Sequence, residues 1–176
     1  MAFPDFSDVE AGTPFTWEAS GGTHALTLTS LGSDAGRQGV KSASLIHATK
    51  GRPEFLDVLI ESAVAAAATN GKEIELYFSE SVSATAGTGN PGGLSGTDVS
   101  LSSPDEIKAQ LNFVGALTLA NSLGTGVQRQ RHCYQPACEF ISPAVVNKSG
   151  QALTSTAANH KITVTPYYRR ILEGPT

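Results

Sequence analysis

Residues 73–79 read Glu73-Ile74-Glu75-Leu76-Tyr77-Phe78-Ser79, with apolar side chains at every second position. Upstream, residues 54–66 alternate in the same way. A period of two is typical of a strand with one buried face. An alanine run and Asn70-Gly71, a strong short turn signal, join the two stretches. The pattern therefore predicts a long hairpin of residues 54–66 with 73–81. Alanine also favours helices, so a helix over 54–68 is the alternative.

Similar patterns along the rest of the chain predict further strands. They cover residues 24–31, 40–47, 111–119, 127–134, 137–141, 144–147 and a last strand from 162. Gln135-Pro136 predicts a hairpin between two of them, and residues 111–119 are expected to bury one parity throughout. Pro166 lies inside the last strand and predicts an edge position or a bulge. About nine strands with turns between them predict an all-β fold, an antiparallel β-sandwich.

One short helical turn is expected near 104–109. Ser103-Pro104-Asp105-Glu106 offers an N-cap hydroxyl, a proline at the first helical position and a glutamate three residues after the cap. We divide the chain into an extended arm, residues 1–12, and one sandwich domain, residues 13–176. The sandwich contains a long loop of Ser, Thr, Gly and Pro at 82–102, which we expect to be ordered.

Composition excludes several classes of protein. The 176 residues suit one domain, and 12 basic against 16 acidic residues give a net charge of −4, which disfavours binding to nucleic acid. The longest apolar run, residues 63–68, is far too short for a bilayer span. The first ten residues lack the pattern of a secretory signal, so we expect synthesis in the cytoplasm.

Catalytic and metal-binding motifs are missing from the sequence. It has no nucleophile elbow, zinc-protease helix motif, phosphate-binding loop, EF-hand loop or dinucleotide fingerprint. The paired carboxylates Asp57/Glu61 and Glu73/Glu75 fall on strand faces where solvated charge is the usual explanation. We therefore expect no enzymatic activity and no cofactor.

Cys133 and Cys138 are the only cysteines, and His132 precedes the first of them. Two cysteines cannot form a disulfide scaffold or a four-thiolate zinc site. Three interpretations stay open: free thiols in ordinary packing, a Cys133–Cys138 disulfide across the turn, or a metal site completed by distant histidines.

The polar run Gln128-Arg129-Gln130-Arg131-His132 has two interpretations. It is either a solvated edge strand, whose charges deter aberrant pairing, or a subunit interface, where arginine is enriched. The same two interpretations hold for Tyr167-Tyr168-Arg169-Arg170. Trp17, the only tryptophan, is expected in the core rather than as a platform for a ligand.

Three stretches resemble a family of structural proteins from the virions of tailed bacteriophages. They are ELYFSES (75–81) running into ATAGTGNPGG (84–93) and SGTD (95–98), then QLNFVG (110–115), and finally VVNKSGQAL (145–153) followed by ITVTPYY (162–168). The resemblance covers about residues 50–170 and implies a jelly-roll sandwich that decorates the phage head as a cement protein.

The resemblance also implies partners and a location. A cement protein binds over junctions of the major capsid protein, contacts neighbouring copies of itself and lies on the capsid surface of the virion, with no membrane. Residues 1–12 and 82–102 are expected to make these contacts. The contact residues we name are Phe3, Phe6, Asn90, Pro91, Gly92, Arg129, Arg131, Tyr167 and Arg169. A tail, neck or baseplate protein and a carbohydrate-binding module are the alternatives.

Overall fold

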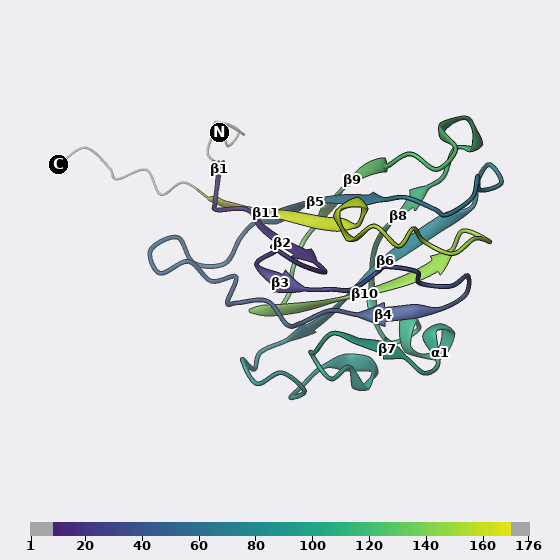
Figure 1. The fold of residues 1–176 in the computed structure, drawn as a ribbon. Helices are drawn as coiled ribbons and strands as arrows, with labels where there is room; N and C mark the ends of the chain where they lie inside the picture. Colours follow the sequence, from purple (N-terminus) through teal and green to yellow (C-terminus); the bar gives the residue numbers. More distant parts are fainter. Residues whose placement is uncertain (1–8, 170–176) are drawn as a thin grey trace.

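The computed structural model describes residues 9–169, which form two β-sheets packed face to face (Figure 1). Sheet A has the order β3 (His24–Ala25), β2 (Phe15–Glu18), β11 (Lys161–Arg169), β5 (Phe55–Ser62) and β9 (Gln128–Tyr134), with β1 (Val9–Ala11) also on β11. Sheet B has the order β7 (Val99–Leu101), β4 (Gly36–Gln38), β10 (Phe140–Lys148), β6 (Glu73–Ser81) and β8 (Asn112–Thr118). The predicted antiparallel all-β sandwich is confirmed; among the described strands, only the short β2–β3 pair is parallel.

The order of the strands follows a nested pattern. β2, β4, β5 and β6, which come early in the chain, pair with β11, β10, β9 and β8 respectively, and the two sheets take these pairs alternately. This connectivity is the one that results when a single long hairpin is folded around a core. It is that of two Greek keys. Both ends of the described chain, β1 and the end of β11, therefore lie side by side.

The two predicted hairpins are wrong, although their strands exist. β5 lies in sheet A and β6 in sheet B, and β9 and β10 are divided in the same way. The connections, residues 63–72 and 135–139, are longer than a tight two-residue turn and carry the chain across the sandwich. The crossing brings the apolar faces of β5 and β6 together in one core. The strand at 55–62 also excludes the alternative helix over 54–68.

Prolines divide the strands differently from our expectation. Residues 140–141 of the predicted strand 137–141 and all of the predicted strand 144–147 belong to one strand, β10, which contains Pro143, whereas 137–139 lie in the connection before it. The Gly39 N–H donates to the Pro143 carbonyl (2.9 Å), and Pro143 has no N–H to donate in return, so β4 ends at Gln38. β11 is not an edge strand. β1 and β2 pair with successive parts of β11, and Pro166 lies between these two parts. The Gly12 N–H donates to its carbonyl there (2.7 Å).

Three further sequence expectations need correction. Residues 24–31 form a strand only at β3, and 40–47 form none, but Leu26, Leu28 and Leu45 are buried in the core. Their alternation therefore reflects packing of an irregular chain rather than a ladder. The register between β8 and β6 shifts beside Leu76. As a result Val114 is buried and Phe113 is 56% exposed. The buried side chains of β8 therefore do not all fall on alternate positions, contrary to our expectation for 111–119.

The short helix is confirmed as α1 (Pro104–Lys108). Ser103 is its N-cap residue, but its side chain makes no capping hydrogen bond, so the expected capping box is not formed. The described chain also has single 3₁₀ turns at η1 (Pro91–Gly93), η2 (Asn121–Leu123) and η3 (Ala157–Asn159). Within residues 9–169, no helix has the length and apolar character that a membrane crossing requires.

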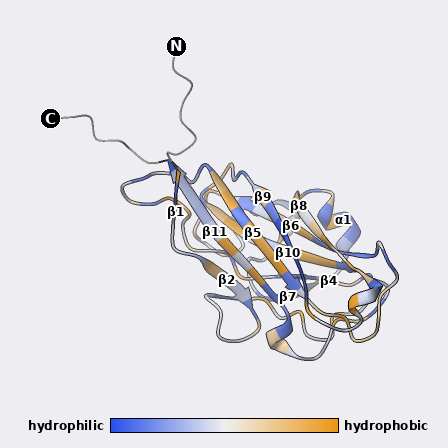
Figure 2. Ribbon diagram, turned by 90° about the horizontal axis from the view of Figure 1, so that it is seen from above, coloured by the Kyte–Doolittle hydropathy of each residue, from blue (hydrophilic) through white to orange (hydrophobic). Residues whose placement is uncertain are grey.

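The main core fills the space between the sheets, and Trp17 is fully buried in it, as predicted. The Trp17 Nε1–H donates to the Val40 carbonyl at 2.7 Å, so the indole has its polar partner. Apolar and polar residues alternate along β5 and β11, as the colours of Figure 2 show. A second, smaller core lies on the other side of sheet B, where residues 82–111 pack.

Candidate functional site

The outer faces of the two sheets differ in what covers them. Along β5 and β11, burial alternates strictly between one side chain and the next, which leaves every second side chain on the outside of sheet A. We call this surface, together with the outward side of β9, the open face. Its residues are Phe55, Asp57, Leu59, Glu61, Arg129, Arg131, Cys133, Lys161, Thr163, Thr165, Tyr167 and Arg169.

The strand register places opposite charges next to one another on the open face. Arg129 lies opposite Glu61 and its Nε donates to the Glu61 carboxylate at 2.5 Å. Arg131 is one row further along and pairs diagonally with Asp57. The arginine side chains are 60% and 67% exposed, whereas Glu61 and Asp57 are 14% and 24% exposed. The carboxylates thus lie low on the sheet and the guanidinium groups project above them.

An aromatic pair lies at one end of the open face. Phe55 and Tyr167 face each other across β5 and β11 and stack with their ring centres 4.7 Å apart and an interplanar angle of 10°. Arg169 pairs with Glu54 at 3.2 Å beside them. A shallow hollow of about 440 Å³ opens here, lined by Phe55, Asp57, Arg131, His132, Cys133 and Tyr167. A neighbouring hollow of about 500 Å³ is lined by Arg52, Pro53, Glu54, Gln135, Pro136 and Ala137.

Both cysteines are free thiols in the structure, Cys133 on the open face and Cys138 half-buried. Burial and the nearby Glu80 carboxylate raise the pKa of the Cys138 thiol, which keeps it protonated and unreactive at neutral pH. Among residues 9–169, no cluster of His, Cys, Asp and Glu side chains could hold a metal ion.

The inward side of β9 protects the neighbouring edge of sheet B. Gln128 and Gln130 accept hydrogen bonds from the backbone N–H groups of Ala120 (2.8 Å) and Thr118 (2.9 Å), and His132 Nε2 lies 3.1 Å from the Ala116 carbonyl. The polar run at 128–132 therefore alternates between this edge and the open face. It lies on the edge strand of sheet A, as one of our two interpretations expects. The alternation of amides with arginines was the signal that sequence reasoning missed.

Sheet B is covered on its outer side by the chain itself. Residues 82–111, the covering segment, bring Leu94, Leu101, Ile107 and Leu111 onto Tyr77, Ala144 and Val146. The strands below are consequently buried on both faces: every residue of β10 is buried except Lys148. In Figure 1, α1 lies on the side of sheet B that faces away from sheet A, next to β7, the edge strand of sheet B.

A buried lysine holds the first part of the covering segment. Lys41 is only 6% exposed, and its Nζ lies within 2.8–3.2 Å of four oxygens. These are Ser81 Oγ and the carbonyls of Ser83, Thr85 and Thr88. Burial lowers the pKa of Lys41 from its ordinary value, but the ring of oxygens provides hydrogen-bond acceptors for the ammonium group. One buried cation thus orders a loop that has few apolar side chains.

Two tight contacts close the loop. The Asn90 side-chain amide donates to the carbonyls of Ala86 (2.6 Å) and Leu94 (2.7 Å). Gly96 lies so close to Ala86 that a Cβ at this position would be 2.1 Å from the Ala86 carbonyl oxygen. These contacts hold the two ends of the loop against each other.

Asp98 joins the end of the loop to sheet B. Its carboxylate accepts from Arg37 Nε (2.6 Å), from the Thr27 N–H (3.1 Å) and from the Thr27 hydroxyl (2.6 Å). Burial of the carboxyl raises its pKa, but the hydrogen bonds from Arg37 and Thr27 outweigh this, and the pKa of Asp98 lies below its ordinary value. The ionised form of Asp98 is therefore the one that fastens the segment.

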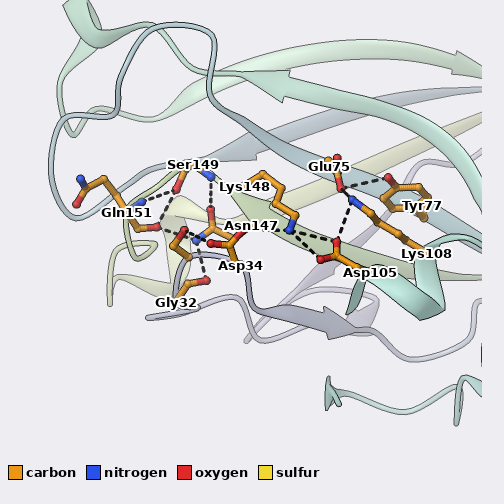
Figure 3. A network of polar contacts seen from close by, with 11 residues as sticks. Gly32, Asp34, Glu75, Tyr77, Asp105, Lys108, Asn147, Lys148, Ser149 and Gln151 are labelled. Atoms are coloured by element: carbon orange, nitrogen blue, oxygen red, sulfur yellow. Dashed lines mark hydrogen bonds and ion pairs between the residues drawn. The ribbon is translucent and has the colours of Figure 1, made fainter. Parts of the chain in front are cut away.

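A chain of alternating charges fastens α1 to the same face. Figure 3 shows it passing from Asp34 to Lys148, Asp105, Lys108 and Glu75. The Lys108–Glu75 contact is 2.9 Å, and the hydroxyl of Tyr77 donates to the same carboxylate. Burial, together with Glu75, raises the pKa of Tyr77 to about 12, so it remains a donor. The network ties the helix to β6 and β10.

The residues that we named from the sequence separate into two groups. Arg129, Arg131, Tyr167 and Arg169 are brought together on the open face. Asn90, Pro91 and Gly92 lie in the covering segment, where Asn90 is turned into the loop and Pro91 is exposed. Phe3 and Phe6 lie outside the residues that the structure describes.

Comparisons with known proteins place the chain in no family. No protein-family model matches it, and neither does a curated protein. Among solved structures it is similar to dimeric latent PorU from Porphyromonas gingivalis, with 12% identity and a TM-score of 0.37. The similarity covers 92% of this chain but only 13% of PorU, and at this level it supports no conclusion about function.

Proposed function

We propose that the chain is a non-enzymatic structural protein of a phage virion, a decoration or cement protein that binds over capsomer junctions and stabilises the expanded head. The observation that carries the proposal is the contrast between the two outer faces. A rigid sandwich has one face sealed by its own chain and the opposite face presenting arginines and a stacked aromatic pair. Arginine and aromatic residues are enriched in protein–protein interfaces.

Most of the stretches that resemble phage virion proteins lie in or over sheet B. Residues 75–81 form most of β6, 84–98 form the loop above it, 110–115 lead into β8, and 145–148 end β10. They supply parts of three strands of sheet B and part of its cover, whereas the last stretch, 162–168, lies in β11 of sheet A. The resemblance therefore lies mostly in how the covered face is built, and the nested order of the strands in the two sheets agrees with it.

Cementing needs little energy from each copy. A protein that binds only the expanded lattice stabilises that lattice by an amount set by its affinity and its concentration. Many copies on one shell add these small contributions. The sandwich acts in this proposal as a rigid body between contacts with the major capsid protein and with neighbouring copies.

The proposal is tested by counting copies of the chain per virion, using quantitative mass spectrometry against the major capsid protein. We expect a ratio near one or a simple fraction such as one third. A few dozen copies or fewer would place the protein in the tail, neck or baseplate instead. Absence from virions would overturn the virion role, and a glycan array would then test a carbohydrate-binding module.

The N-terminal arm offers a second test. β1 pairs with β11, so we limit the deletion to residues 1–8, which carry Phe3 and Phe6, and leave β1 in place. We expect the truncated protein to fold and to bind expanded heads less tightly. Unchanged binding would remove the arm from the contact and leave the open face to make it.

A further inference from the structure

We infer that the open face is a docking surface for a carboxylate-bearing protein surface, held by Arg129, Arg131 and Arg169. The inference deepens the proposed function, because it names the chemistry of the surface on which the chain would dock. It depends on that function for the identity of the partner. The chemistry itself follows from how the charges are layered on sheet A.

At each of the three arginines, the arginine side chain is more exposed than the carboxylate side chain with which it pairs. Arg129, Arg131 and Arg169 are 60%, 67% and 75% exposed, whereas their partners Glu61, Asp57 and Glu54 are 14%, 24% and 40% exposed. A partner approaching the sheet therefore meets guanidinium groups before carboxylates. The open face thus presents positive charge to whatever docks on it.

The guanidinium groups keep donors for a second acceptor. Arg129 uses Nε for Glu61, and Arg131 uses Nη1 for Asp57. A guanidinium carries five N–H donors in a planar fork that fits a carboxylate in two hydrogen bonds. The ion pairs within the chain also fix the direction of each long side chain, which reduces the entropy lost when a partner binds.

The hollow beside the arginines adds an apolar contact. Phe55 and Tyr167 form its aromatic wall, and Arg131 borders it. Arginine and tyrosine are among the residues that dominate binding energy at protein interfaces, particularly beside a pocket. A partner with acidic residues around one apolar side chain matches this arrangement.

The carboxylates on and beside the open face favour a protein over a nucleic acid. Asp57, Glu61 and Glu54 lie next to the arginines, where they would repel the phosphate that every nucleotide carries. The net charge of the chain, −4, opposes binding to a nucleic acid as well. Carboxylates that lie apart on the surface of a folded protein can each pair with one arginine.

The test uses the full-length ¹⁵N-labelled chain and two probes, hexaglutamate and a hexamer of thymidylate, followed by NMR at low salt. We expect hexaglutamate to shift amide signals of β5, β9 and β11 and not those of the covering segment. Arg131→Gln should weaken this binding about fivefold, since it removes a charge-assisted fork. Arg131→Lys should weaken it less, because the charge stays.

Lys72→Gln is the matched control, since Lys72 is exposed in the turn before β6, away from the open face. It should leave the affinity for hexaglutamate unchanged, and the spectra report whether each variant is folded. Shifts outside the open face, equal loss in the control, or tighter binding of thymidylate would each overturn the inference. Copy number in virions is measured independently, so failure of the docking chemistry and failure of the virion role are distinguishable.

Discussion

β5 and β10 show how differently the two sheets use their outer faces. In β5, burial alternates along all of Phe55–Ser62, whereas in β10 every residue from Phe140 to Asn147 is buried. Both strands contribute to the same main core. The difference arises because the covering segment buries the outer face of sheet B, while sheet A keeps its outer face in solvent. The chain thus covers one face and leaves the other exposed to solvent.

The covered face also shows how a loop poor in apolar residues becomes ordered. The loop is positioned by one buried lysine inside a ring of oxygens, by Asn90, by the close approach at Gly96 and by the carboxylate of Asp98. Buried polar groups that find partners specify one geometry, and they are costly to disturb. Substitutions on the covered face should therefore affect stability more than substitutions on the open face.

The largest effect is expected from Gly96→Ala. Gly96 and Gly93 both have a φ of +65°, but a Cβ at Gly93 meets nothing within 4 Å. Both substitutions carry the strain of a left-handed residue, about 1–2 kcal/mol. Only Gly96→Ala adds a clash with the Ala86 carbonyl, which should bring the total loss to about 3 kcal/mol or more. Urea denaturation of the two variants measures the difference; equal losses would show that the loop is not held at Gly96.

Replacing the buried cation comes next. Lys41→Met removes charge-assisted hydrogen bonds to the Ser83, Thr85 and Thr88 carbonyls, and we expect a loss of about 2–3 kcal/mol. Hydrogen exchange should accelerate in residues 82–98 while β5 and β9 keep their protection. Lys72→Met, at an exposed position, is the control and should change neither. Unchanged exchange in 82–98 would contradict the role of Lys41.

Acid should loosen the same segment through Asp98. The folded-state pKa of Asp98 is lowered, so its contribution to stability is complete above the ordinary pKa near 4 and is lost as the pH falls through the lower folded-state value. Asp98→Asn should cost about 2 kcal/mol at neutral pH and flatten this part of the acid profile. Denaturation measured from pH 7 down to about pH 2 tests both. A variant that keeps the wild-type slope would contradict the assignment.

The smallest effects belong to the open face. Arg129→Ala and Arg131→Ala each remove a solvent-exposed ion pair, and such pairs contribute less than about 1 kcal/mol. Thermal denaturation should therefore barely distinguish these variants from the wild type. A loss of stability as large as that of Lys41→Met would mean that the open face stabilises the fold. It would contradict the difference in stability that we expect between the two faces.

Alternation in the sequence predicts strands well but not their neighbours. The stretches 54–62, 73–81 and 161–169 are strands because each has an apolar face that must be buried. Alternation says which side of a strand is buried, but it does not say against which strand it pairs. Both predicted hairpins failed for this reason, since connections that cross the sandwich look like loose turns in the sequence.

The candidate site was predictable only in part. Arg129, Arg131, Tyr167 and Arg169 stood out because they lie in arginine-containing runs of predicted strands, for which a subunit interface is one of two interpretations. Their meeting on one face depends on β5, which separates β9 from β11 and which no local pattern places between them. The ring of oxygens around Lys41 was not predictable either, because backbone carbonyls leave no mark on residue types.

The most direct test compares the chain free in solution with the chain on intact virions by hydroxyl-radical footprinting. Tyr167 and Phe55 report on the open face, and Phe113, 56% exposed on β8, reports on sheet B. We predict that Tyr167 and Phe55 become protected on the virion while Phe113 keeps its reactivity. Protection of Phe113 and the covering segment, with Tyr167 unchanged, would contradict the account.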